Sequence, residues 1–524
     1  MTDTSADVSF TPPTRAQWLE SALAGLGAGR SFEALQQQTL DGLTIQVLYD
    51  HCPDTRALAA SANAISLTSS LPSLPGADEK YTWDNRAFIQ TTEPVKKANG
   101  RLKKALLGGN TSAELHVTGN TDLNGLLDGI LLDIAVLSFR AGGDHASVSK
   151  QFHDKIIAAS IDPEHVCCYL NADPIGELLS SGRIPHSMPD EIMNMARFSH
   201  KLQNTLPQAK SVLVDVALHH NAGASASQEL HAAIATATLY LQALLDTGMS
   251  VAQANSTIVF QMACDADTMM GVVKLRSLRC LWQHVLQQFD VQTQAVDDTP
   301  TGAAGNISIQ PLPTQITAET SRRYLTRLEP WNNHLRNIAA CTAAAMAGAD
   351  TIMVHPHDRA DNWQSDEDPE IGLRMARNLP IILEREAGLT GVTDPMAGAY
   401  AVESLTTELT ELTWASLAEQ GDSTHWLERI TSGDWQSALA LTHQQRLALM
   451  QAGQQIMVGV NRYSRENSSE ATTAELTESA GNATKAGSVQ ESTQKQSGIQ
   501  LRLACDAVAY ETQAFEPSVD QSKV

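Results

Sequence analysis

Between residues 81 and 457 the chain alternates short apolar runs with longer stretches of helical periodicity. The short runs hold apolar, often β-branched side chains at nearly every position, which is typical of parallel strands covered by helices on both faces. This long series of strand–helix units, with no dinucleotide fingerprint after the first strand, favours an α/β fold. We expect a closed (β/α)8 barrel of the TIM type rather than an open Rossmann sheet. The predicted strands are residues 113–117, 165–170, 211–218, 257–263, 307–310 and 351–356, and the predicted helices include residues 228–247, 267–288 and 331–347.

The sequence before the barrel region has a different composition. A helical pattern starts near Gln17, and residues 42–49 form a strand candidate. Residues 61–78 are rich in Ser, Pro, Ala and Gly, which predicts a loop or linker. We therefore expect an N-terminal helical extension and linker at residues 1–80, followed by the barrel at residues 81–463.

The sequence after the barrel region is of low complexity. Residues 464–497 contain almost no large apolar side chain and cannot bury enough surface to offset the entropy of ordering, so we predict a disordered tail. Within the tail, residues 498–516 regain apolar side chains. That short segment is expected either to dock on a partner or to be the remnant of a lost element, and the tail as a whole is assigned to residues 464–524.

Charge and cysteine content restrict the class of protein. The chain has 36 Lys and Arg against 59 Asp and Glu, a net charge of −23, which disfavours binding to nucleic acid and to anionic membranes. No apolar run approaches the roughly 18 residues of a spanning helix, and the N-terminus does not resemble a secretory signal. The seven cysteines are irregularly spaced without a C-x-x-C motif, as expected for reduced thiols in a cytoplasmic protein.

Two histidine-containing loops follow predicted strands, where barrels of this type carry their functional residues. His219 and His220 follow the strand predicted at residues 211–218, and on a strand only one of the two would face the barrel mouth. His220 is the candidate catalytic residue. The alternative is that both histidines have a structural role. His355, His357 and Asp358 follow the last predicted strand, and we favour a polar loop there over a metal site.

Other polar clusters have plain structural interpretations. Lys274, Arg276 and Arg279 lie on a predicted helix at spacings that form no single stripe, which favours pairing with neighbouring acids over contacts with acyl-CoA phosphates. Gly108 and Gly109 follow a predicted helix and indicate a C-terminal cap and turn rather than a phosphate-binding loop. No P-loop, G-x-S-x-G or H-E-x-x-H motif occurs in the sequence.

Two long segments, residues 329–358 and 374–406, closely resemble the adenosylcobalamin-dependent acyl-CoA mutases, the methylmalonyl-CoA mutase family. The matching residues include Ala376-Arg377-Asn378, Glu386, Asp394-Pro395, Gly398, Tyr400, Val402-Glu403 and Leu405-Thr406, with earlier matches at residues 41–49, 172–174, 220–224 and 274–282. The resemblance covers about residues 18–463. It implies a (β/α)8 barrel that holds acyl-CoA along its axis, a separate cobalamin domain, and interconversion of methylmalonyl-CoA and succinyl-CoA.

The sequence departs from the catalytic members of that family at several positions. Phe88 stands where they carry a tyrosine whose hydroxyl contacts the acyl group. Residues 310–321 replace a stretch with catalytic His and Arg groups, and the Arg that pairs with the substrate carboxylate has no clear counterpart. The D-x-H-x-x-G motif that ligates cobalt is absent, so we expect no flavodoxin-like cobalamin domain. His220 corresponds to the family's active-site His only with a shortened spacing, which makes it a vestigial candidate.

Together these departures make the chain most similar to the small subunit of the heterodimeric bacterial enzyme. That resemblance implies a non-catalytic subunit of the complex in propionate metabolism, with no metal or cofactor of its own. Adenosylcobalamin and acyl-CoA would lie on a large catalytic partner subunit. The alternatives are a catalytic barrel that works with a separate cobalamin-binding chain, and a transient regulatory or maturation factor.

Overall fold

The computed structural model describes residues 13–26, 31–51, 83–91, 94–296, 312–360, 363–364, 369–421, 423–464 and 500–501. Eight parallel strands close into a barrel in the order β10-β3-β4-β5-β6-β7-β8-β9, which confirms the predicted fold class. The barrel strands are β3 (Asp84–Gln90), β4 (Ser112–His116), β5 (Val136–Arg140), β6 (Cys168–Ala172), β7 (Lys210–Asp215), β8 (Ile258–Cys264), β9 (Gln315–Thr320) and β10 (Thr351–Met353).

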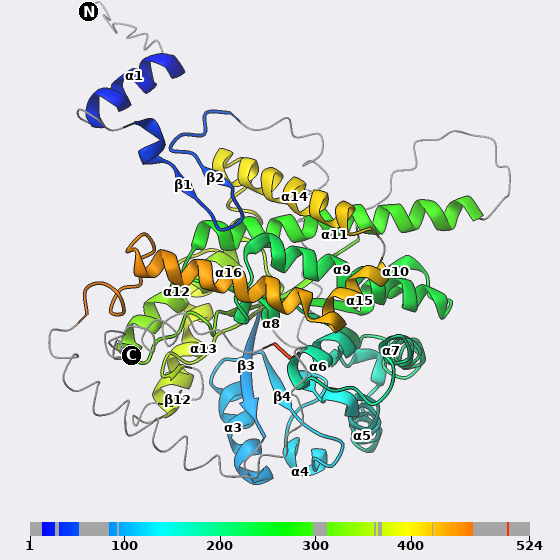
Figure 1. Ribbon diagram of the computed structural model, residues 1–524. Helices are drawn as coiled ribbons and strands as arrows, with labels where there is room; N and C mark the ends of the chain where they lie inside the picture. The colour runs from blue at the N-terminus through cyan, green and yellow to red at the C-terminus, as the bar shows by residue number, and fades with distance from the viewer. Residues whose placement is uncertain are drawn as a thin grey trace, which may run out of the picture.

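Helices cover the outside of the barrel and one of its ends (Figure 1). Their apolar faces pack on the outward side chains of the strands and form the main hydrophobic core. The helices are α1 (Arg15–Leu26), α3 (Val95–Leu107), α4 (Leu123–Leu126), α5 (His145–Ala158), α6 (Pro174–Ser181), α7 (Met188–Leu202), α8 (Ala217–Asn221), α9 (Ala226–Asp246), α10 (Val251–Thr257), α11 (Thr268–Val296), α12 (Pro330–Met346), α13 (Pro369–Arg385), α14 (Tyr400–Gln420), α15 (Ser423–Ser432) and α16 (Asp434–Gln451).

Two barrel strands, β3 and β5, have no counterpart among the predictions. Five predicted strands correspond to β4, β6, β7, β8 and β10, but the one predicted at residues 307–310 lies outside the described residues, and β9 begins at Gln315. In β3, Asp84 and Arg86 interrupt the apolar run, because these side chains face the barrel interior rather than the helices. β5 is short and ends at Arg140, which lines the cavity at the end of the barrel.

A polar contact between two side chains crosses the barrel interior near the amino ends of the strands. The Arg86 guanidinium lies over the Tyr169 ring, 4.2 Å from its centroid, although their strands β3 and β6 are not neighbours. Arg86 also donates to Asp84 at 2.9 Å and to Ser112 at 3.1 Å. Val136 packs against Tyr169 in the same layer. Since Arg86 is almost completely buried and paired, this layer closes the barrel beneath its mouth.

The basic residues of α11 hold the helical layer to the barrel, as the sequence interpretation expected. Arg276 forms ion pairs with Asp394 at 2.7 Å and with Glu403 on α14 at 2.9 Å. Arg279 donates to the Thr314 carbonyl at 2.6 Å and lies 3.5 Å from Asp350. Both arginine side chains are fully buried, so their charges stabilise the fold only while these acceptors remain in place.

The ends of the chain show short extensions. The predicted N-terminal helix is α1, whereas only Thr44–Ile45 of the strand candidate at residues 42–49 is a strand, β2, paired with β1 (Gln37–Gln38). A second short antiparallel pair joins β11 (Arg359–Ala360) to β12 (Trp363–Gln364). The linker at residues 61–78 and nearly all of the low-complexity tail lie outside the described residues.

Two described residues of the tail contact this chain itself. The Leu501 amide donates to the Leu179 carbonyl at 2.7 Å, and Gln500 donates to the Ser180 carbonyl at 2.8 Å. Leu501 also packs against the main core. This part of the expected docking segment therefore lies on α6 of its own chain. No helix within the described ranges is long and apolar enough to cross a bilayer.

Removing the Arg276 charge is expected to destabilise the fold strongly. In an Arg276→Met variant, Asp394 and Glu403 lose their buried cation, and the free energy of unfolding should fall by about 3–5 kcal/mol. Chemical denaturation followed by circular dichroism measures this loss. Arg183→Met, at an exposed position, serves as the control and should change stability little. Equal stability of the two variants would contradict the structural role of Arg276.

Candidate functional site

The carboxyl ends of the eight strands surround a cavity of about 370 Å³ at the barrel mouth. This is the position at which barrels of this type carry their active sites. Every strand contributes a side chain to its wall. The inward residues at this level are Phe88 (β3), Glu114 and His116 (β4), Arg140 (β5), Asn171 (β6), Asp215 (β7), Gln261 (β8), Glu319 (β9) and Met353 (β10), with His355 directly after β10.

Arg140 bridges two carboxylates in the cavity wall. Its Nη1 donates to Asp215 at 2.8 Å, and its Nε lies 3.5 Å from a Glu114 oxygen. Burial alone would raise the pKa of Glu114, but Arg140 and the adjacent His116 outweigh it and lower the pKa to about 2. For Asp215, burial outweighs the attraction of Arg140 and raises the pKa to about 6. The Arg140 guanidinium is thus engaged by two neighbouring acids, although its Nε has no hydrogen-bond partner among the described residues.

A further buried carboxylate, Glu319, lies on the opposite wall with a glutamine and a histidine beside it. Glu319 accepts a hydrogen bond from Gln261 at 2.7 Å and lies 3.5 Å from His355 Nε2. Burial opposes ionisation of Glu319, but His355 lowers its pKa below the usual value. The Phe88 ring stands between the imidazoles of His116 and His355, with centroid distances of 4.8 and 6.0 Å.

The cavity is acidic overall. Glu114 Oε2 and Asp215 Oδ1 have no hydrogen-bond partner among the described residues, although both atoms are buried. The lining carboxylates are Glu114, Asp173, Glu177, Glu191, Asp215 and Glu319, and the lining arginines are Arg140 and Arg322. Such a wall attracts water or cations and repels a ligand that brings a carboxylate of its own.

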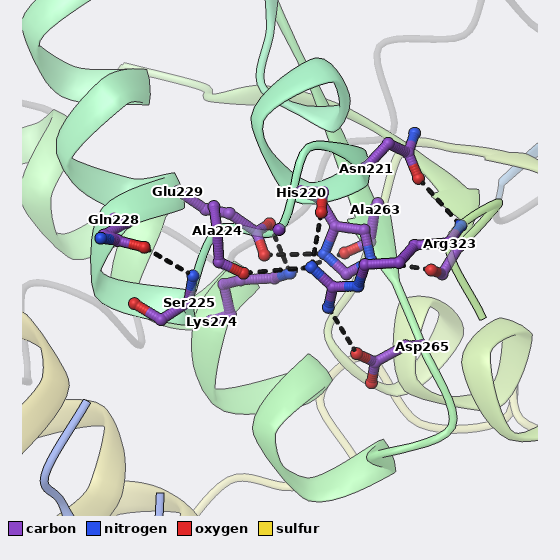
Figure 2. Close-up of polar contacts among 12 residues, drawn as sticks. His220, Asn221, Ala224, Ser225, Gln228, Glu229, Ala263, Asp265, Lys274 and Arg323 are labelled. Carbon is purple, nitrogen blue, oxygen red and sulfur yellow. Dashed lines mark hydrogen bonds and ion pairs between the residues drawn. The ribbon is translucent and has the colours of Figure 1, made fainter. Parts of the chain in front are cut away.

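His220 does not line this cavity. It belongs to the short helix α8 rather than to the strand predicted at residues 211–218, which ends as β7 at Asp215. Its side chain is 1% exposed, with Nδ1 2.7 Å from Glu229 and Nε2 2.8 Å from the Ser321 hydroxyl (Figure 2). His219 points elsewhere and accepts a hydrogen bond from the Trp435 indole at 2.9 Å.

Two cations complete the network around His220. Lys274 donates to Glu229 at 2.6 Å and to the Ala263 carbonyl at 2.7 Å, while Arg323 donates to the backbone carbonyls of His220 and Ala224 (Figure 2). Burial lowers the pKa of His220 well below its ordinary value, and Arg323 and Lys274 lower it further. The imidazole is therefore neutral at physiological pH.

Ser321, His220 and Glu229 follow the hydroxyl–imidazole–carboxylate order of a nucleophilic triad. The surroundings do not suit that chemistry. Ser321 is 3% exposed, and an imidazole kept neutral by burial and two cations is a poor proton acceptor. The network instead joins the loop after β7 to α9, α11 and the end of β9. Through that connection it holds Asn221, which does line the cavity, in place.

The loop after β10 directs one side chain into the cavity and buries others in the core. His355 lines the mouth, whereas His357 is 2% exposed and packs against the Trp331 ring at 4.7 Å. Asp358 lies so close to Gly372 that an added Cβ would be 2.2 Å from the carboxylate oxygen. Within the described ranges, no three His, Cys, Asp or Glu side chains gather as metal ligands.

Sequence reasoning missed most of the cavity wall. Arg140, Asp215, Gln261 and Glu319 were not recognised as site residues, although each is a polar residue in the second half of a barrel strand. The signal that was available is a polar side chain at the carboxyl end of successive strands, at the alternate positions that face the barrel interior.

The chain resembles proteins of one family along most of its length. The family model described as methylmalonyl-CoA mutase matches residues 111–520. The "Methylmalonyl-CoA mutase small subunit" of Streptomyces virginiae is 31% identical over 449 residues, which is 82% of this chain and 66% of that protein. That of Propionibacterium freudenreichii subsp. shermanii is 29% identical over 344 residues, 64% of this chain and 50% of that protein.

A relative without the small-subunit designation is more distant. The "Methylmalonyl-CoA mutase" of Escherichia coli (strain K12) is 22% identical over 484 residues, 85% of this chain and 63% of that protein. This chain thus spans between half and two thirds of the length of these three relatives.

Acid should destabilise the fold partly through His219. Burial lowers the pKa of His219 to about 4, whereas the unfolded chain has an ordinary value of about 6.5. The unfolded state therefore binds the proton more readily, and stability falls with decreasing pH across this window. By about pH 5 the loss from His219 amounts to about 2 kcal/mol.

The measurement is the melting temperature at about pH 7.5 and about pH 5 for the wild type and for His219→Gln. The Gln carbonyl can still accept the Trp435 hydrogen bond but cannot take up a proton. The variant should lose less stability than the wild type between the two pH values. Equal losses would show that His219 is not kept neutral in the folded state.

Proposed function

The chain belongs to the methylmalonyl-CoA mutase family, and we propose that it is a small, non-catalytic subunit of an adenosylcobalamin-dependent mutase complex. In this proposal a larger partner chain holds both acyl-CoA and cofactor, and the complex interconverts methylmalonyl-CoA and succinyl-CoA. The cytoplasm would be its location. The observation that carries the proposal is the charge of the barrel mouth.

A methylmalonyl or succinyl group carries a carboxylate and needs a cation to bind in a closed cavity. Two arginines line the mouth: Arg140 is already bonded to Asp215 and close to Glu114, and Arg322 is exposed. Binding the acyl group would add a further carboxylate to a wall in which carboxylates already outnumber arginines. Like charges in such surroundings disfavour binding by several kcal/mol.

The layer beneath the mouth gives independent support. A substrate chain along the barrel axis would have to pass between Arg86 and Tyr169, which meet across the axis. Arg86 is 3% exposed and ion-paired to Asp84, so displacing it would uncover a buried charge. Phe88, at the mouth, also lacks the hydroxyl that the catalytic members are expected to present to the acyl group.

The residues at the mouth do not fit cobalamin. The imidazoles that line it are each engaged within the chain: His116 with Glu114 at 3.2 Å, His145 with the Gly142 carbonyl at 3.1 Å, and His355 near Glu319 at 3.5 Å. A carboxylate-rich wall is a poor surface for the cofactor's apolar ring edge, and each of these imidazoles lies against a carboxylate or a backbone carbonyl of this chain. The proposal therefore assigns the cofactor to the partner.

Partner dependence can be tested by co-expression with the large mutase chain of the same organism. We expect a stable 1:1 complex in size-exclusion chromatography, and succinyl-CoA turnover only when the large chain is present. In this chain, Phe88→Tyr and Glu319→Gln should leave the kcat of the complex unchanged within assay error. The matched control replaces the large chain's tyrosine at the position equivalent to Phe88 with Phe, which should remove most activity.

Turnover by this chain alone, or with a separate cobalamin-binding chain, would overturn the proposal. It would favour the alternative of a catalytic barrel whose cofactor arrives on another polypeptide. Loss of complex activity in Glu319→Gln, with assembly intact, would likewise place this chain's own barrel mouth in the reaction.

A further inference from the structure

A second cavity, of about 280 Å³, lies on the outer wall of the barrel between α3 and α13. Both helices contact β3, whose outward face forms the floor between them. The floor and inner walls are apolar and do not reach the barrel mouth's carboxylates. Their apolar residues include Ala87, Ile89, Ala105, Val354 and Ala376.

Basic side chains border this cleft. Arg101 and Lys104 come from α3, and Arg374 and Arg377 come from α13. The one lining acid, Glu370, is ion-paired with Lys104 across the cleft. In a chain with 36 basic and 59 acidic residues, this local excess of positive charge creates an electropositive pocket on an acidic protein.

The backbone beside the cleft is shaped to admit Arg377. A Cβ on Gly108 would lie 2.1 Å from the Arg377 Nη1 atom, so the guanidinium packs directly against this glycine. Gly109 has φ +113°, a conformation that other residues rarely adopt. Asn85 fixes the Arg377 backbone by donating to its carbonyl at 3.0 Å. The Gly108–Gly109 turn thus caps the C-terminus of α3, as expected, and the Arg377 guanidinium packs against it.

Two of the four cations are not used by the fold. Neither Arg374 nor Arg377 forms a side-chain ion pair with a described residue, and the buried Arg377 Nε has no hydrogen-bond partner there. By contrast, the buried Arg276 is bonded to two carboxylates. Guanidinium groups bind phosphate and carboxylate groups in a bidentate manner.

We propose that this cleft binds a small organic anion, with a phosphate or carboxylate group held by Arg374 and Arg377 and an apolar body on the floor above β3. The volume is close to the lower limit of about 300 Å³ for pockets that enclose drug-sized ligands, so the ligand is small. The site is separate from the barrel mouth and does not depend on the subunit proposal.

The test is a calorimetric titration of the full chain with four probes. Phenyl phosphate and benzoate combine an apolar body with the two anionic groups, inorganic phosphate lacks the body, and benzamide lacks the charge. Phenyl phosphate or benzoate should bind more tightly than inorganic phosphate and benzamide. The stronger of the two identifies the anionic group that the site prefers.

Arg374→Ala and Arg377→Ala should each weaken that binding by about tenfold, as expected for losing one charge-assisted hydrogen bond. Arg374 is exposed, so its variant should fold normally even if Arg377→Ala is destabilised. Arg183→Ala, outside the cleft, is the matched control and should bind like the wild type. Binding of no probe, or equal binding by Arg374→Ala and the wild type, would overturn the proposal.

Discussion

The barrel mouth depends on one arginine that is shared by two buried acids. Arg140 is bonded to Asp215 and lies near Glu114, and the other arginine that lines the cavity, Arg322, is exposed. Without Arg140, Asp215 would lose its ion-pair partner and Glu114 would keep only His116 beside it, which costs several kcal/mol. Because the guanidinium is occupied in this way, the same cavity cannot also offer it to an anionic acyl group. The stability of the barrel mouth and the binding of a carboxylate-bearing substrate therefore compete for the charge of Arg140.

The network behind the mouth follows the same logic. His220, Glu229 and Lys274 satisfy one another in a buried position, and Arg323 uses its charge on backbone carbonyls. If His220 corresponds to the family's active-site histidine, its role in this chain is to support the cavity wall. The basic residues of α11 behave in the same way, because their buried charges hold this helix to α14 and to the segment before β9. Arg374 and Arg377 stand out because the fold does not use them in this way.

The sequence allowed the architecture to be predicted better than the site. Apolar strands such as β7 and β8 alternate with amphipathic helices, and that pattern is sufficient to predict a barrel. β3 escaped prediction because Asp84 and Arg86 interrupt its apolar run, whereas β5, with the sequence VLSFR, was overlooked although its run is largely apolar. The cavity wall could not be assembled from sequence, because its residues come from eight strands and only barrel closure brings them together. The pairing of His220 with Ser321, a hundred residues later, is equally invisible to local patterns.

The most direct test of the account is to compare the affinities of succinyl-CoA and CoA for the isolated chain by calorimetry. The two ligands differ only in the acyl group. Any binding of the CoA portion elsewhere on the protein therefore contributes equally to both dissociation constants. The account predicts equal dissociation constants, since an acidic mouth gives a succinyl group no favourable contact. Tighter binding of succinyl-CoA would contradict it and would show that the barrel mouth accepts the acyl group.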